Sequence, residues 1–519
     1  EGRLLCVPPE RNASPVPLTV DGEGLRDPQG RSVWVDSSGR VQSEGGQYLG
    51  VLRPPSPSQV LGWVRSLFEQ PAGGEASTLD LLLAATPRAE QEQIRAHLPQ
   101  TAQAALSELR CAPVLINWDL RPFARPLSQI RRAHRGIGDH ALTIFRTEHS
   151  MVFDQSHIFF DGLWGMAVAE ILTDGAIHAH RRLEEVSSSP VISVSALDLA
   201  VPPATLSQIR RHVRQTEVAA ESTGIDLPQI SRLRRWLKQR GVKLTVNDLL
   251  LLYRFFHTVE YRISPEVRQA LSDLEMRGRR EIRETIDATL ERLRETNPAL
   301  LIPMDAGYVS PRERIYPTTF RNPLTEISAL YAGVQARYLA YRHSFHAADW
   351  EAFDAARRDL LAYLKAFGEV LEALKSVTMR GESFNTATLR LLAHLPPAMQ
   401  HLLDDIPQQI GVLNEVLKGS EVFSNVGRVA PGSTLHRFIS AKDDGAAKEL
   451  VWGVLTDDHD VVHVSLRDFR PFVSLLLERG EDRLAQMLAE DYLDSYVEGF
   501  NRFVAHLSKI AAVKKRSAR

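Results

Sequence analysis

Two groups of strand patterns that lie far apart in the chain constrain the fold most. The first group lies within residues 112–157 and the second within residues 421–466, each bounded by turn signals. Residues from about 264 to 418, between the two groups, are mostly helical in pattern. A chain of 519 residues is also too long for one compact core. The sequence therefore predicts an α/β protein built as two domains or as one pseudo-symmetric pair.

Shifts in composition give the predicted domain bounds. Residues 1–55 are rich in Gly, Asp, Pro and Ser and predict a β-rich N-terminal extension. We expect residues 56–225 to form a first lobe and residues 226–519 a second lobe, which includes the helical insertion at about 264–418. Within that insertion, the proline-bearing stretch from Pro303 to Pro323 predicts a linker.

Charge, hydropathy and cysteine content narrow the class of protein. The formal net charge is -2, so no overall field favours nucleic acid or an anionic membrane. We see no apolar run long enough to span a bilayer. The two cysteines, Cys6 and Cys111, are too few for a disulfide framework, so we expect a protein of the reducing cytoplasm. They also do not form a zinc-binding pattern, and we expect no metal. The sequence begins Glu1-Gly2-Arg3 without an initiator Met, which is compatible with a further segment upstream of Glu1.

The segment His157-Ile158-Phe159-Phe160-Asp161-Gly162 is the main candidate for chemistry. Residues 142–157 predict one strand, whose odd positions from His149 to His157 share a face, and an apolar helix follows Asp161-Gly162. A histidine at a strand end can take a proton from a hydroxyl, amine or thiol. Asp161 would support the turn that holds the imidazole, and Gly162 would let the chain bend. A buried core histidine before an ordinary turn is the alternative.

Several further elements are predicted from periodicity and capping signals. Thr245 or Asn247 is expected to cap a long apolar helix, since its side-chain oxygen can accept a hydrogen bond from free backbone N–H groups. The other predicted helices and strands are 91–109, 227–240, 472–479 and 486–507 as helices, and 112–120, 421–426, 435–440, 450–455 and 461–466 as strands.

The order of these motifs resembles that of the chloramphenicol-acetyltransferase-like superfamily of coenzyme-A-dependent acyltransferases. Residues 141–172 resemble its HxxxDG region, which is also similar to the active-site region of choline/carnitine acyltransferases. The segment Thr245–Leu250 looks like the helix start of peptide-synthetase condensation domains and wax-ester synthases. Phe423–Gly427 looks like the SNV strand of the second lobe, and 451–466 like the hairpin that closes this lobe.

This resemblance implies a two-lobed fold of mixed sheets with helices, related by a pseudo-two-fold axis. It also implies a coenzyme A thioester as co-substrate and direct transfer of the acyl group in a ternary complex, with His157 as general base. Ser424 and Asn425 would stabilise the oxyanion. Phe153 and Gln155, on the predicted strand face of His157, would contact substrate, and Trp164 would either do so or pack in the core.

Departures from the family patterns leave the acceptor open. Ser156 stands where condensation domains and wax-ester synthases carry a first histidine. The DFGWG motif of plant acyltransferases is absent, and only Ser424 could stand near the STS motif of carnitine acyltransferases. The donor is an acyl-CoA or an acyl carrier protein, and the acceptor a small molecule or lipid. A condensation-type enzyme that makes amides from carrier-bound substrates, and a catalytically silent binding or assembly module, are the alternatives.

Two other clusters have simpler interpretations. The basic stretch Arg131–Arg135 could meet a coenzyme phosphate, but a solvated loop is favoured. Asp457–Asp460 could suggest a metal, but a hairpin turn is favoured.

Overall fold

The chain divides into two compact units in the computed structural model. The first unit comprises Glu1–Arg125, Ile130–Phe160 and Ala167–Arg214, and the second Pro126–Gln129, Asp161–Met166 and Gln215–Arg519. The structure describes residues 5–6, 19–21, 24–26, 30–35, 40–51, 56–69, 77–86, 88–110, 112, 114–135, 140–156, 160, 162–184, 195–213, 216–296, 300–305, 315–320, 324–380, 421–440 and 448–514. None of the helices in these ranges combines the length and apolar character needed to cross a bilayer.

The N-terminal part of the first unit is a small antiparallel sheet. Its five strands follow one another in sequence order, and Val33, Val41 and Leu49 form its own small core. The described residues within 1–55 are therefore largely in strands, while the extension as a separate part of the chain stays a prediction. The strands are β2 (Thr19–Asp21), β3 (Gly24–Arg26), β4 (Ser32–Val35), β5 (Arg40–Ser43) and β6 (Tyr48–Val51), and a separate pair joins β1 (Leu5–Cys6) to β10 (Ser195–Ala196).

Helices supply most of the core of the first unit. Leu79, Leu83, Leu106 and Ile209 belong to one buried cluster that joins four of these helices. A single helix was expected over 91–109, but the chain breaks at Pro99, which has no N–H to continue the helix. The helices are α1 (Pro57–Phe68), α2 (Leu79–Ala84), α3 (Arg88–Ala96), α4 (Gln100–Arg110) and α7 (Pro203–Arg210). The residues of α5 (Leu127–Ile130) and α6 (Gly162–Glu184) are divided between the two units.

A three-stranded sheet leads up to the HxxxDG segment. Its strands are β7 (Val114–Arg121), β8 (Leu142–Thr147) and β9 (Met151–Gln155), in which β7 and β8 are parallel and β8 and β9 antiparallel. The prediction of one strand over 142–157 is therefore wrong. The Thr147 hydroxyl accepts hydrogen bonds from the amides of His149 and Ser150 at 3.4 and 2.9 Å, which closes a turn. His149 lies in this turn and not on a strand face.

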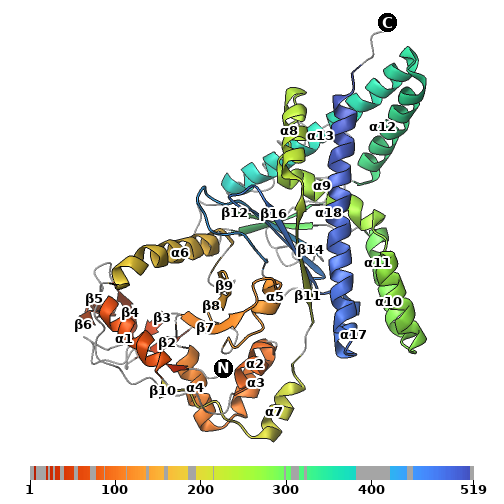
Figure 1. The fold of residues 1–519 in the computed structure, drawn as a ribbon. Helices are drawn as coiled ribbons and strands as arrows, with labels where there is room; N and C mark the ends of the chain where they lie inside the picture. The colour runs from red at the N-terminus through yellow and green to blue at the C-terminus, as the bar shows by residue number, and fades with distance from the viewer. Residues whose placement is uncertain are drawn as a thin grey trace. The chain divides into compact units, whose positions relative to one another are not determined.

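The second unit is organised around a six-stranded mixed sheet (Figure 1). The order is β11-β16-β15-β14-β12-β13, with β14 parallel to both β15 and β12. The expected linker at Pro303–Pro323 is wrong, because this stretch contributes the paired strands β12 and β13 to the sheet. The strands are β11 (Val218–Ile225), β12 (Leu300–Asp305), β13 (Ile315–Phe320), β14 (Glu421–Arg428), β15 (Leu450–Thr456) and β16 (Val462–Asp468).

The strands predicted near the C-terminus are found, with one exception. Residues 435–440 form no strand, although the chain remains ordered there as irregular backbone. The turn predicted at Asp457–Asp460 does join β15 to β16, and the Asp457 carboxylate accepts hydrogen bonds from the amides of His459 and Val461. Asp457 also pairs with His463 at 2.9 Å, so its side chain fixes the hairpin.

Long helices pack against this sheet and form its core. In Figure 1, α18 runs beside α8 and α9 and along the sheet, where it packs on β11. Trp452 and Phe423 are completely buried, and the Tyr496 ring lies tilted against the Trp452 ring, with 4.8 Å between the ring centroids. The helices are α8 (Leu227–Gln239), α9 (Val246–Glu260), α10 (Pro265–Met276), α11 (Arg280–Thr296), α12 (Leu324–Ser344), α13 (Ala347–Arg380), α17 (Pro471–Glu478) and α18 (Asp482–Ala512).

Candidate functional site

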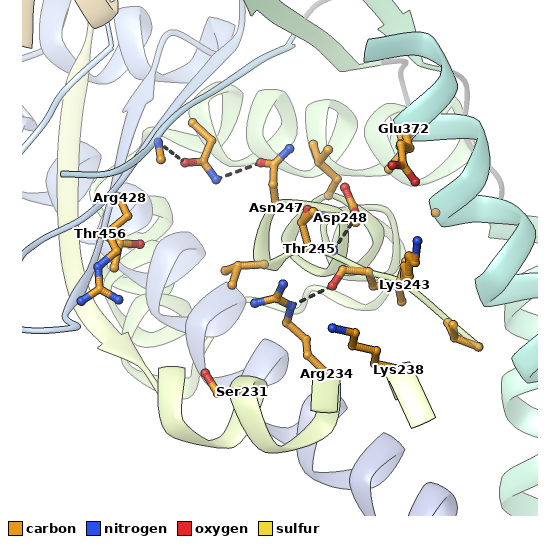
Figure 2. A pocket seen from close by; sticks show the side chains of 18 of the residues that line it. Ser231, Arg234, Lys238, Lys243, Thr245, Asn247, Asp248, Glu372, Arg428 and Thr456 are labelled. Carbon is orange, nitrogen blue, oxygen red and sulfur yellow. Dashed lines mark hydrogen bonds between the residues drawn. The ribbon is translucent and has the colours of Figure 1, made fainter. Parts of the chain in front are cut away.

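A cavity of about 1250 Å³ opens in the second unit, between α8, the start of α9, α13 and the strands β12, β14 and β15. Figure 2 shows the side chains that surround it. The lining combines cations, polar groups and apolar side chains: Ser231, Arg234, Arg235 and Lys238 from α8; Val242, Lys243, Leu244, Thr245, Val246, Asn247, Asp248 and Leu251 around the start of α9; Ile302 from β12; Gly368, Leu371 and Glu372 from α13; Asn425, Gly427 and Arg428 from β14; and Thr456 from β15.

A reciprocal cap fixes the start of α9 at the cavity. The Thr245 hydroxyl accepts a hydrogen bond from the Asp248 amide at 3.1 Å, and the Asp248 carboxylate accepts one from the Thr245 amide at 2.6 Å. Thr245 is therefore the cap that the sequence allowed, whereas Asn247 lies inside the first turn. The positive end of the helix dipole consequently faces a cavity lined by cations, an arrangement that favours an anion.

Two asparagines from separate elements meet at the cavity. Asn425 of β14 donates a hydrogen bond from Nδ2 to Oδ1 of Asn247 at 2.9 Å, and its own Oδ1 accepts from the Gly427 amide at 2.8 Å. Gly427 has φ of 83°, which L side chains rarely adopt, and the pairing of β14 with β15 shifts at this point. The SNV strand therefore ends in an irregularity that holds the Asn425 carboxamide in one orientation.

Cations dominate the charge of the lining. Arg234 donates from Nε to the Leu244 carbonyl at 2.7 Å, which fixes its guanidinium beneath the start of α9 (Figure 2). Arg428 pairs with Asp460 at 2.7 Å. Within the part of the chain that the structure describes, Lys238 and Lys243 form no ion pair. The cavity therefore keeps positive charge available for a ligand.

Helix α13 closes one side of the cavity at very short range. Gly368 is buried, and a Cβ placed on it would lie 2.3 Å from the Lys243 carbonyl oxygen and 3.0 Å from Cδ2 of Leu244. Only a glycine lets the helix come this near to the loop before α9. Part of the predicted helical insertion is therefore a wall of the cavity.

The end of the HxxxDG segment lies beside the SNV strand. Gly162, the first residue of α6, belongs to the second unit, and a Cβ on it would lie 3.1 Å from Cγ1 of Val426. These two sequence motifs are separated by more than half of the chain, and they meet at this point. Ser424 is half-buried two residues before Val426 and does not line the cavity, whereas Asn425 does.

The other predicted site residues have different positions. His157 and Asp161 lie outside the described residues. Phe153 and Gln155 are half-buried at alternate positions of β9. The side chain of Trp164 is 51% exposed, so the interpretation of Trp164 as a core residue is wrong.

The basic stretch Arg131–Arg135 proves to be structural. Arg131 and Arg135 both form ion pairs with Asp154 of β9, at 3.3 and 2.9 Å. His134 contacts the buried carboxylate of Asp80 at 2.9 Å, and this hydrogen bond raises the pKa of His134. Neither the solvated loop nor a phosphate site describes these side chains.

The cavity cations were missed in the sequence, although a signal for them exists. Residues 227–247 contain six Lys and Arg residues and no Asp or Glu. An amphipathic helix in a chain of net charge -2 would ordinarily mix the two signs. The absence of acidic residues in this helix was the clue.

No protein-family model matches the sequence, and no curated protein sequence matches it. Several solved structures are similar to the chain, and two of them are described here. The epimerization domain from the third module of tyrocidine synthetase B has 11% sequence identity and a TM-score of 0.29, and the match covers 83% of this chain and 90% of that domain. The wax ester synthase/diacylglycerol acyltransferase from Marinobacter aquaeolei VT8 has 13% identity and a TM-score of 0.26, with 73% and 79% covered.

The second of these proteins bears the name of one of the families that the sequence motifs resemble. At these TM-scores the similarities decide neither the architecture nor the activity. The function proposed below therefore rests on the motifs and on the cavity.

Proposed function

We propose that this protein is an acyltransferase that moves an acyl group from a phosphopantetheine thioester to a hydroxyl or amine. One observation carries the proposal. Three segments chosen in the sequence as superfamily motifs, Thr245–Leu250, Phe423–Gly427 and the hairpin at 451–466, each contribute residues to the lining of one cationic cavity. The fourth, HxxxDG, ends at Gly162 against Val426 of the same strand. The proposal includes the two-lobed architecture and the domain bounds predicted above.

The residues that line the cavity suit the phosphate-bearing arm of such a thioester. Coenzyme A and the carrier-protein arm both carry phosphate, which Lys238, Lys243 and the start of α9 would attract. Val242, Leu251 and Leu371 offer apolar surface for the rest of the arm. The cavity thereby supports a donor that is anionic at one end and uncharged along its length.

The chemical step would be direct transfer between two bound substrates. His157 would take the proton from the acceptor as its oxygen or nitrogen attacks the thioester carbonyl. The tetrahedral intermediate would collapse with cleavage of the carbon–sulfur bond, and the thiolate would receive the proton from His157. Asp161 and Gly162 would shape the turn that carries the imidazole. Holding both substrates together would supply much of the rate enhancement.

Asn425 and Ser424 are the proposed donors to the oxyanion. Asn425 uses one N–H of its carboxamide on Asn247, and its Oδ1 is held by Gly427, so the group is fixed while a second N–H remains. A preorganised donor of this kind contributes about 3 kcal/mol to transition-state stabilisation in comparable sites.

The test is thiol release from a panel of acyl-CoAs and acyl carrier proteins, with and without alcohol and amine acceptors. We expect acceptor-dependent release that falls by about 100-fold or more in His157→Ala, because the general base is lost. His149→Ala is the matched control: this histidine lies in the turn before β9, and its removal should leave the rate unchanged.

Undiminished release by His157→Ala would exclude the general-base role. If the wild-type protein releases no thiol from any donor of either type, the acyltransferase proposal fails. The binding-module alternative would then apply.

A further inference from the structure

The exposed side of α8 and the loop that follows it carry an unusual excess of positive charge. The buried side chains of α8, such as Leu233 and Leu237, face the core, so the helix is amphipathic and its polar side is well defined. Every charged residue between Leu227 and Asn247 is a cation. We name these six residues the α8 basic surface: Arg232, Arg234, Arg235, Lys238, Arg240 and Lys243.

The cations of this surface have no carboxylate partner in the described part of the chain. Among the described residues, none of its six side chains forms an ion pair, and all but the half-buried Arg234 are exposed. Helix α11 shows the ordinary pattern for comparison, since Arg280 pairs with Glu284 and Arg283 with Asp287. Like charges three and four residues apart on a helix repel each other. An anionic partner would relieve this repulsion.

The surface extends beyond the cavity. Arg234, Arg235, Lys238 and Lys243 line the cavity, whereas Arg232 and Arg240 do not. Arg240 lies over the Trp236 ring at 4.5 Å, which holds its charge in place outside the mouth. A small phosphorylated ligand inside the cavity would leave these outer cations without a partner. A larger anion, seated on α8 and reaching into the cavity, would use all of them.

We propose that the α8 basic surface docks an acidic carrier protein, whose phosphopantetheine arm enters the cavity. The acidic face of the carrier would lie on Arg232 and Arg240, and the phosphate at the root of its arm would meet the cations of the cavity lining. This inference rests on the proposed function and deepens it, because it selects a carrier-bound donor over free coenzyme A. Charge complementarity commits the surface to an acidic protein.

The experiment measures binding of three probes to the full chain: coenzyme A, an acidic acyl carrier protein with its phosphopantetheine arm, and the same carrier without the arm. Each probe is titrated at 50 and 200 mM salt, about a fourfold range in which surface attraction weakens. We expect the armed carrier to bind more tightly than either coenzyme A or the armless carrier. Arg232→Glu should weaken carrier binding by about 5-fold to 10-fold and leave coenzyme A binding unchanged. Arg483→Glu, an exposed cation on α18 without an ion pair among the described residues, is the matched control.

The outcomes distinguish a failure of the docking proposal from a failure of the proposed acyltransferase function. If coenzyme A binds and the armed carrier does not, or if Arg232→Glu and Arg483→Glu weaken the carrier equally, the docking proposal is wrong and the acyltransferase proposal survives. Binding of phosphatidylglycerol vesicles that is lost in Arg232→Glu, without carrier binding, also overturns it in favour of a membrane surface. If neither coenzyme A nor the carrier binds, the proposed function itself fails.

Discussion

His257 lies in the core of the second unit with both ring nitrogens unpaired. It is 1% exposed, and within the described residues neither Nδ1 nor Nε2 has a hydrogen-bond partner. The rings of Tyr261, Tyr492 and Tyr496 surround it, with Tyr492 at 4.5 Å. Burial, and then the nearby cations Arg254 of its own helix and Arg470 before α17, lower its pKa well below the ordinary value of 6.5. The imidazole is therefore neutral in the folded protein.

A buried neutral histidine makes folding stability depend on pH. Below pH 6.5 the unfolded chain binds a proton at His257 and the folded chain does not, so stability is retained above this pH and lost as the pH falls. We expect the wild type to lose about 1.4 kcal/mol between pH 7.5 and 5.5 from this group alone. His257→Phe should lack that component in urea unfolding measured at both pH values. The exposed His343→Gln is the control, and equal pH slopes for wild type and His257→Phe would contradict the assignment.

Helix α13 packs very closely against the loop before α9, and this close packing depends on Gly368. Gly368→Ala would place a methyl group 2.3 Å from the Lys243 carbonyl oxygen, so backbone must move. We expect a loss of about 1–3 kcal/mol in the free energy of unfolding, as for other overpacked sites. Weaker coenzyme A binding should accompany this loss, because the same loop positions Arg234 and the start of α9.

The matched variant for Gly368→Ala is Gly333→Ala on α12. The nearest contact of a Cβ at Gly333 is the flexible end of Arg337 at 3.3 Å, and alanine favours a helix over glycine by about 1 kcal/mol. Gly333→Ala should therefore be neutral or stabilising. If both substitutions have the same effect on unfolding, the close approach of α13 has no energetic role.

Sequence reasoning succeeded for elements with a strong local signal and failed where tertiary pairing decides. The helix at 227–239, the Thr245 cap and the strands at 421–428, 450–456 and 462–468 follow from periodicity and capping. The turn after Thr147 has neither glycine nor proline, and its signal is a single hydroxyl that accepts two amides. Strands β12 and β13 contain Pro303 and Pro317, which favour a linker in sequence, yet their partners in the sheet keep them extended.

The sequence motifs that contribute to the candidate site could be predicted, but the contacts between them could not. The segments that line the cavity were identified individually, but only the fold brings Asn247 next to Asn425, and Gly162 next to Val426. The contribution of α13 had no sequence signal, since Gly368 is an ordinary glycine until its contact with Lys243 is known. Paired arginines such as Arg131 and Arg135 were likewise indistinguishable from free ones before Asp154 was placed.

The location of the cavity leads to a prediction for the whole molecule. All of its lining residues belong to the second unit, so a ligand that binds there stabilises that unit directly. At coenzyme A concentrations about 100 times Kd, binding adds about 2.7 kcal/mol to the stability of the unit that holds the ligand. Hydrogen exchange should slow in peptides from 227–251 and 421–428 and stay unchanged in 79–110. Protection confined to the first unit, or protection that persists in Lys243→Glu, would place the ligand elsewhere.

The wall formed by Ile302 of β12 and by Gly368, Leu371 and Glu372 of α13 has a consequence for any attempt to shorten this protein. The region between α11 and β14 looks like an appendage in the sequence, and a minimal version would delete it first. Such a deletion would remove one side of the cavity and a strand partner of β14. Because Val334 of α12 and Phe353 and Phe367 of α13 belong to the main buried core, the trimmed protein would lose folding stability together with its ligand compartment.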